Sequence, residues 1–156
     1  MSRDWKLPRE GGCRCGALRF DVSGPPMMTA ACHCRGCQRM SGSAFSLTVM
    51  VPAEGFTITK GEPVIGGLKG DNKHYFCPSC LSWVFTRPMQ LASVVNIRST
   101  MLDETGDMAP FMETCTGEKL SFIDLPVHRS YDVFPEAEDI GPLIEAFSQW
   151  DGKPAG

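Results

Sequence analysis

Seven of the eight cysteines fall into three short clusters, and no other feature restricts the fold of this chain as strongly. The clusters lie at 13–15, 32–37 and 77–80 and read C-R-C, C-H-C-R-G-C and C-P-S-C. A structural zinc ion takes four protein ligands, whereas a catalytic zinc ion usually takes three and leaves a position for water or substrate. Seven clustered thiols therefore predict one closed metal site and one open site.

The spacing within the clusters supports this division. Side chains at i and i+2 of a strand point to the same face, which suits a C-x-C pair. A C-x-x-C pair needs a tight turn, and Pro78 favours one by fixing φ. The central cluster combines both spacings, so its three thiols can converge from one segment. The sequence thus predicts a closed site from Cys13, Cys15, Cys77 and Cys80 and an open site from Cys32, Cys34 and Cys37.

Three other interpretations of the cysteines remain open. Disulfides persist mainly in oxidising compartments, and residues 1–10 lack the apolar core of a secretory signal. A thioredoxin-like role for residues 77–80 would need a nearby βαβ pattern, but the residues that follow are typical of a strand. In the third interpretation both metals are structural, and His33 or a distant residue completes the second site.

Composition indicates a single domain without a nucleic-acid or membrane partner. A chain of 156 residues buries roughly 68–70 % of its unfolded surface. The net charge is −3 and basic residues form no long run, which argues against binding to a phosphate backbone. No apolar run approaches the length of a membrane span. We therefore expect a cytoplasmic protein that is a monomer or a homodimer.

Apolar and polar residues alternate in several short segments that are separated by turn residues, as in a mainly β fold. A further strand should lead into Cys32 and deliver the open site. The predicted strands are 17–22, 44–51, 56–60, 73–77, 81–86 and 93–97, of which 73–77 and 81–86 should form a hairpin around the third cluster.

The C-terminus instead has the pattern of an amphipathic helix. Ile140, Leu143, Ile144 and Phe147 recur at i, i+3, i+4 and i+7. Asp139 is the expected N-cap. The apolar face should pack on its own domain, with a dimer contact as the alternative.

The three cysteine clusters, in this order, resemble those of the glutathione-dependent formaldehyde-activating enzyme family, which includes centromere protein V. Residues 32–43 are similar to the family signature C-H-C-x-x-C-R-R-x-S-G-[SA], and residues 11–16 and 75–80 resemble its G-x-C-x-C-G and aromatic-C-x-x-C segments. Weaker matches lie at 100–103 and 124–126, so the resemblance covers roughly 11–135.

The resemblance implies a β-tent zinc fold over 5–135, followed by a helical extension at 136–156 that packs on it. It also implies two zinc ions, a structural one on Cys13, Cys15, Cys77 and Cys80 and a catalytic one on Cys32, Cys34 and Cys37. Two positions depart from the family pattern. Leu81 replaces the usual glycine after C-x-x-C and predicts an altered or strained turn. Gln38 replaces a common arginine and leaves the substrate contacts beside the open site undefined.

The implied activity is that of a carbon–sulfur lyase, in which a thiol, expected to be glutathione, adds to a small aldehyde to give a hemithioacetal. Three thiolates make zinc a weak Lewis acid, so capture of a thiol is favoured over hydrolysis. A non-catalytic β-tent module that binds protein partners is the alternative, and a metal-storage or redox-sensing protein is a third possibility.

Other residues carry weaker signals. His33 is expected to be packed, because its neighbours on both sides are ligands that face the other way. Arg35 and Arg39 would suit the carboxylates of glutathione or would be solvated. Cys115 is expected to be a buried, unreactive thiol. The serines of the central segment are assigned to a turn, His74 to structure, and the pair at 128–129 to a pocket wall: Ser41, Ser43, His74, His128 and Arg129.

Overall fold

The computed structural model describes residues 3–68 and 70–156. The chain divides into two compact units, each assembled from separate segments. Unit 1 comprises residues 3–4, 27–48 and 106–156, and unit 2 comprises residues 5–26 and 49–105. The chain passes from unit 1 to unit 2 within strand β4 (Ser46–Pro52).

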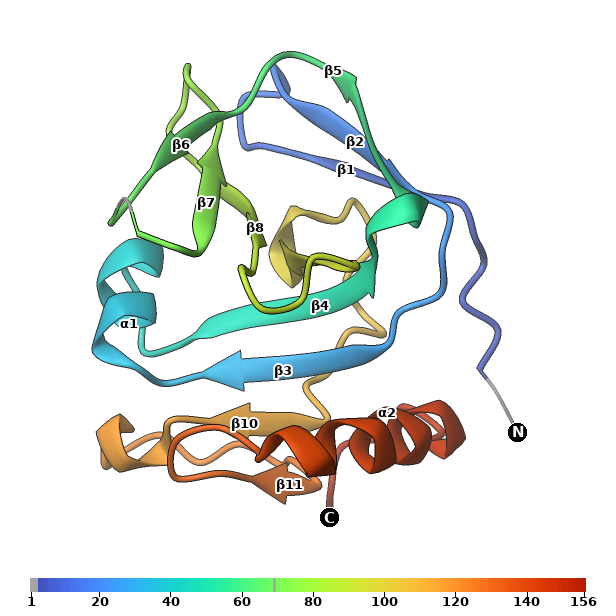
Figure 1. Ribbon diagram of the computed structural model, residues 1–156, viewed down its shortest axis with the longest axis vertical. Coiled ribbons are helices and arrows are strands. Elements are labelled where there is room, and N and C mark those ends of the chain that lie inside the picture. Colours follow the sequence, from blue (N-terminus) through green and yellow to red (C-terminus); the bar gives the residue numbers. More distant parts are fainter. Residues whose placement is uncertain (1–2, 69) are drawn as a thin grey trace. The chain divides into compact units, whose positions relative to one another are not determined.

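Unit 1 is built on short parallel strands. Strand β10 lies between β3 and β11 and runs parallel to both (Figure 1). The register places Thr114 of β10 beside Cys32, the last residue of β3. The elements of unit 1 are β3 (Met28–Cys32), α1 (Arg35–Ser41), β10 (Met112–Thr114), η3 (Thr116–Glu118), β11 (Arg129–Ser130), η4 (Ala137–Asp139) and α2 (Ile140–Gln149).

The predicted C-terminal helix is present as α2, and its apolar stripe is partly buried. Leu143 and Phe147 are buried, and the ring of Phe147 lies 5.8 Å from that of Phe111, which directly precedes β10. Asp139 is the N-cap residue of α2, as expected, but its side chain does not cap the helix. Asp139 ends η4 in a helical conformation and its side chain makes no capping hydrogen bond, because an N-cap side chain needs an extended backbone to reach back to the N–H groups.

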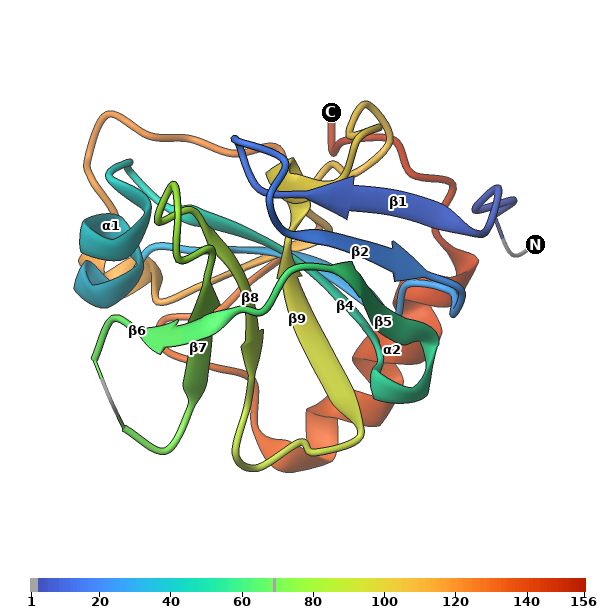
Figure 2. The same cartoon turned by 90° about the horizontal axis from the view of Figure 1, so that it is seen from above.

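Unit 2 is antiparallel throughout its paired strands. One sheet has the order β1-β2-β5, and β6, β7, β8 and β9 lie side by side in a second group (Figure 2). The elements of unit 2 are β1 (Arg9–Gly12), β2 (Arg19–Val22), η1 (Ala53–Gly55), β5 (Phe56–Lys60), β6 (Val64–Gly66), β7 (Lys73–Phe76), β8 (Trp83–Arg87), β9 (Val94–Arg98) and η2 (Ser99–Met101).

Three phenylalanine side chains form an aromatic cluster within the core of unit 2. Phe20 of β2 and Phe85 of β8 are buried, with 0 % and 1 % of their surface exposed. Phe56 lies between them, with ring centroids 5.3 Å from Phe20 and 4.8 Å from Phe85. Such offset contacts add to the free energy gained from burying apolar surface.

The mainly β architecture and the C-terminal helix agree with the sequence prediction, and β7 and β8 form the expected hairpin. The division into a zinc domain at 5–135 and a helical extension at 136–156 stays a prediction. Among the described residues, no helix is long and apolar enough to cross a membrane.

Candidate metal centres

The first and third cysteine clusters meet in unit 2. The sulfur atoms of Cys13, Cys15, Cys77 and Cys80 all lie within 4.8 Å of one another. Cys13 follows β1, and Cys77 follows β7, so the ends of two strands bring the pairs together. Cys13 and Cys77 are buried, whereas Cys15 is exposed. Four converging thiols are the donor set of a closed tetrahedral metal site.

The turn between β7 and β8 positions the second pair of this group. The backbone N–H of Leu81 donates to the carbonyl oxygen of Cys77 at 2.9 Å, and the N–H of Cys77 donates to that of Ser82 at 3.0 Å. The Ser82 hydroxyl lies 3.1 Å from Cys80 Sγ, and this hydrogen bond lowers the pKa of the Cys80 thiol to about 5. Metal ligation requires the thiolate form, which a lowered pKa favours.

Leu81 adopts the unusual backbone conformation that its sequence position predicted. Its φ is +58°, in the left-handed region where glycine is normally found. The side chain is 69 % exposed and so gains little from packing. The turn is therefore strained at this residue.

The central cluster forms the second group, within unit 1. The sulfurs of Cys32, Cys34 and Cys37 also lie within 4.8 Å of one another. Cys32 ends β3, Cys34 is the N-cap of α1 and Cys37 lies in the first turn of that helix. The Cys34 sulfur accepts a hydrogen bond from the backbone N–H of Cys37 at 3.3 Å. A single strand-to-helix connection thus delivers all three thiols.

These thiols differ in their readiness to ionise. A hydrogen bond from the Cys37 thiol, together with one from the Thr114 hydroxyl, lowers the pKa of Cys32 to about 5. The same contact with Cys32, reinforced by burial, raises the pKa of Cys37. Within the group, Cys32 therefore ionises more readily than Cys37.

Neither His33 nor Cys115 belongs to the converging group, as judged from the described part of the chain. Cys115 is buried after β10 with a φ of +57°. Burial and the charge of nearby Cys32 raise the pKa of Cys115 to about 12, so it stays a thiol at neutral pH. His33 lies between two of the cysteines but is fully buried and engaged elsewhere.

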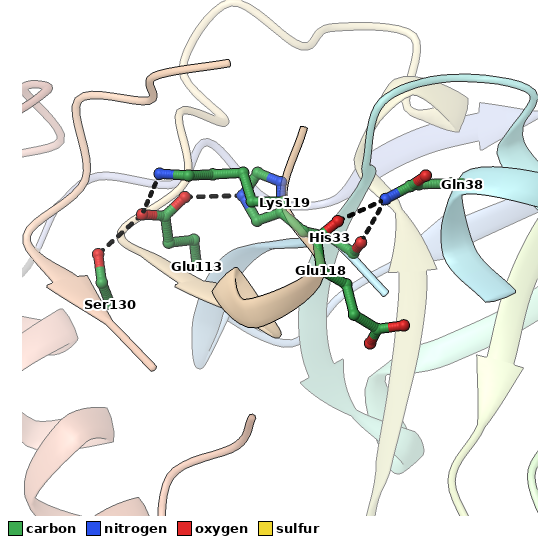
Figure 3. Close-up of polar contacts among 6 residues, drawn as sticks. All are labelled: His33, Gln38, Glu113, Glu118, Lys119 and Ser130. Atoms are coloured by element: carbon green, nitrogen blue, oxygen red, sulfur yellow. Dashed lines mark hydrogen bonds and ion pairs between the residues drawn. The ribbon is translucent and has the colours of Figure 1, made fainter. Parts of the chain in front are cut away.

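The ring of His33 contacts a buried glutamate that the sequence gave no reason to select. Its Nε2 lies 2.7 Å from the Oε2 of Glu113, a residue of β10 that is only 4 % exposed (Figure 3). The other carboxylate oxygen of Glu113 accepts from the Ser130 hydroxyl at 2.8 Å and lies 3.9 Å from the Lys119 ammonium. Glu113 is 80 residues from His33 in sequence, and no motif links the two.

Gln38 binds to the backbone of the cluster and is not free to contact a substrate. Its amide nitrogen donates to the carbonyl oxygens of His33 at 2.7 Å and Glu118 at 3.1 Å (Figure 3). Its amide oxygen accepts from the Arg35 guanidinium. Arg35 and Arg39 are both exposed on α1, close in sequence to the three cysteines of the central cluster.

The remaining histidines have structural contacts. His74 Nδ1 lies 2.8 Å from the Thr86 hydroxyl, and its ring meets the edge of Trp83. Burial, with a smaller effect of the Arg98 charge, lowers the pKa of His74. In unit 1, His128 stacks on Phe111. Its neighbour Arg129 lines a shallow pocket of about 270 Å³ together with Tyr131, Asp139, Pro142, Leu143 and Ala146.

A mainly β chain with two converging groups of cysteine thiols has the features of a protein that binds metal ions through sulfur. Comparison with known families identifies the family to which the chain belongs. The family described as glutathione-dependent formaldehyde-activating enzyme matches residues 8–118. This match covers more than half of the chain, and the chain belongs to that family.

A curated protein and a solved structure also match parts of the chain. A protein of Halomonas elongata with the name "Putative glutathione-dependent formaldehyde-activating enzyme" is 37 % identical over 89 residues, which are 49 % of this chain and 55 % of the relative. The chain thus matches about half the length of this curated relative. The crystal structure of a Rhodobacter sphaeroides protein aligns with a TM-score of 0.49 and 18 % identity, over 60 % of this chain and 87 % of that protein.

Proposed function

We propose that this protein is a zinc-dependent carbon–sulfur lyase that joins glutathione to formaldehyde or a similar small aldehyde and also catalyses the reverse cleavage. Membership of the family carries the proposal. The observation from this chain that supports it most directly is the three-thiol group in unit 1, because a site with three protein ligands leaves room for an external one.

The cysteines fit the proposed metal. Zinc is held in proteins by thiolates, imidazoles and carboxylates, and groups of three or four cysteines are common zinc sites. In this proposal Cys13, Cys15, Cys77 and Cys80 hold a structural zinc ion, and Cys32, Cys34 and Cys37 hold a catalytic one.

The chemistry needs no oxidant or reductant. Cys32, Cys34 and Cys37 would hold the zinc ion, which when bound would act as a weak Lewis acid that lowers the pKa of an incoming thiol. The thiol loses its proton, its sulfur forms a bond to the aldehyde carbon, and the carbonyl π electrons move to oxygen, which takes up a proton. Arg35 and Arg39 are exposed on α1 beside the cysteines, and their guanidinium groups suit the carboxylates of glutathione.

The test is whether the zinc-loaded protein accelerates hemithioacetal formation. Glutathione and formaldehyde react spontaneously, so the rate should be followed by exchange NMR with and without protein. We expect acceleration that is lost in Cys34→Ser, which removes a thiol ligand of the proposed catalytic site while serine can still cap α1. The matched control is Ser41→Ala, a small exposed substitution on the same helix that should retain the activity.

A wild-type protein that binds two zinc ions yet gives no acceleration with any thiol and aldehyde would overturn the proposal. In that case the non-catalytic zinc module that binds protein partners would be the better description.

A further inference from the structure

We propose that Glu113 and Gln38 are positioning residues, which act through His33 to hold the Cys32–Cys37 segment in a metal-ready arrangement. This inference builds on the proposed metal site, but its test measures zinc release and does not depend on turnover. Neither residue is in the group of converging sulfur ligands. Their role would be to fix the residue between two ligands.

His33 is held at three separate points. Its backbone N–H donates to the carbonyl oxygen of Thr114 at 3.1 Å. Its carbonyl oxygen accepts from the Gln38 amide at 2.7 Å, and its ring nitrogen Nε2 lies 2.7 Å from Glu113 Oε2. One peptide bond on each side connects His33 to Cys32 and Cys34. Fixing both backbone groups and the ring therefore restricts the directions in which these two cysteine side chains point.

Gln38 extends the same restraint to the third ligand. It lies on α1 directly after Cys37, and Cys34 caps this helix. Its amide binds the His33 carbonyl before the helix and the Glu118 carbonyl in η3 (Figure 3). The helix that carries Cys37 is thereby tied to the strand end that carries Cys32. All three sulfurs depend on one connected set of hydrogen bonds.

The buried contact between His33 and Glu113 contributes little to the free energy of folding. The His33 side chain is fully buried and that of Glu113 is 5 % exposed. Burying such a pair is a weak source of stability, since the loss of hydration opposes the attraction. A carboxylate accepts hydrogen bonds, so Nε2 must be the donor, which fixes the tautomer and orientation of the ring. The Nδ1 atom is buried and has no hydrogen-bond partner among the residues that the structure describes. We infer that the contact with Glu113 instead serves to orient His33 and the Cys32–Cys37 segment.

Outer contacts of this kind commonly affect metal binding by about ten- to a hundredfold. We therefore expect Glu113→Ala to release one of the two zinc equivalents about tenfold faster than the wild type, and to release the other at the wild-type rate. Zinc release from the loaded protein is followed with a chromogenic chelator. Release of the two zinc ions should give two kinetic phases. Cys34→Ser and Cys15→Ser each remove a ligand from one site, and the phase that changes in each variant belongs to that site. Glu113→Gln keeps an oxygen that accepts from Nε2 and should restore slow release.

A second variant tests the backbone contact independently, should Glu113→Ala fail to fold. Gln38→Met has a similar shape but donates no hydrogen bonds, and it should accelerate the same phase. Thr29→Val is the matched control. Thr29 is also buried in unit 1, and its hydroxyl donates to the Ala109 carbonyl at 2.7 Å without touching His33. This control should lower stability but leave zinc release unchanged.

The proposal is overturned if Glu113→Ala and Gln38→Met both release zinc as the wild type does. It is equally overturned if Thr29→Val accelerates the same phase to the same extent, because general loosening of unit 1 would then explain the effect. If the variants release zinc as expected but the wild-type protein has no lyase activity, the proposed function is refuted and the positioning role still holds.

Discussion

The turn that carries Cys77 and Cys80 ends with a leucine in a left-handed conformation. This single residue shows how far sequence reasoning can reach. The family pattern has glycine at this position, and the need for a positive φ follows from that preference. The structure has φ at +58° for Leu81. The prediction succeeded because the conformation is set locally, by a turn whose ends are fixed by two cysteines.

Replacing this leucine should stabilise the protein. A non-glycine residue in the left-handed region lowers stability by about 1–2 kcal/mol. Glycine avoids this strain but lowers stability by about 0.5–1 kcal/mol, because it increases the conformational entropy of the unfolded chain. We expect Leu81→Gly to raise the free energy of unfolding of the zinc-loaded protein by about 0.5–1 kcal/mol, measured by chemical denaturation.

Leu91→Gly is the control for that change. Leu91 is also exposed, at 42 %, but its φ is not positive. The same substitution there should therefore lower stability. A loss of stability at both positions would show that Leu81 is not strained.

At the scale of elements, the long periodic segments were predictable and the short ones were not. The helix at 140–149 and the strands around residues 56–60 follow directly from apolar spacing. Helix α1 was missed, because its seven residues include a glycine and the clustered Cys37 and show no apolar stripe. Strand β10 has only three residues, too few to show a period, yet it lies beside β3 and supplies Glu113.

Helix α2 offers a direct test of packing. Phe147 is 2 % exposed and meets the rings of Phe111 and Trp150 at 5.8 and 5.9 Å. Truncating a buried phenylalanine leaves a cavity and typically costs about 3–5 kcal/mol. We expect Phe147→Ala to lower the free energy of unfolding by that amount in chemical denaturation.

Ile144→Ala provides the comparison on the same helix. Ile144 is only half-buried, so its truncation should cost clearly less. Equal losses at the two positions would contradict the observed orientation of the helix.

For the whole molecule, the important difference is how far apart the ligands of each group lie in sequence. The four-thiol group connects Cys15 to Cys77 across 62 residues, whereas the three-thiol group lies within one short segment. This grouping was predictable from spacing alone. The contact between His33 and Glu113 was not, because it depends on which strands pair, and the strand pairing is set by the tertiary structure.

Loss of the two metal sites should affect stability unequally. Closing a loop costs entropy that grows with the logarithm of its length, so a crosslink across about sixty residues gains about 2 kcal/mol over one across about five. We expect Cys15→Ser to lower the free energy of unfolding by about 2 kcal/mol more than Cys34→Ser, in zinc-saturated samples. Equal losses in chemical denaturation would contradict this account.

The separation of His33 from Glu113 along the chain also has a consequence for biosynthesis. A ribosome makes Cys80 well before Glu113, so a nascent chain holds every sulfur of the four-thiol group while β10 is still untranslated. The three-thiol segment is also made early, but the contact of its His33 with Glu113 cannot form until Glu113 has been translated. If both groups bind zinc as proposed, the structural ion on the four-thiol group would be bound first and the catalytic ion on the three-thiol group last.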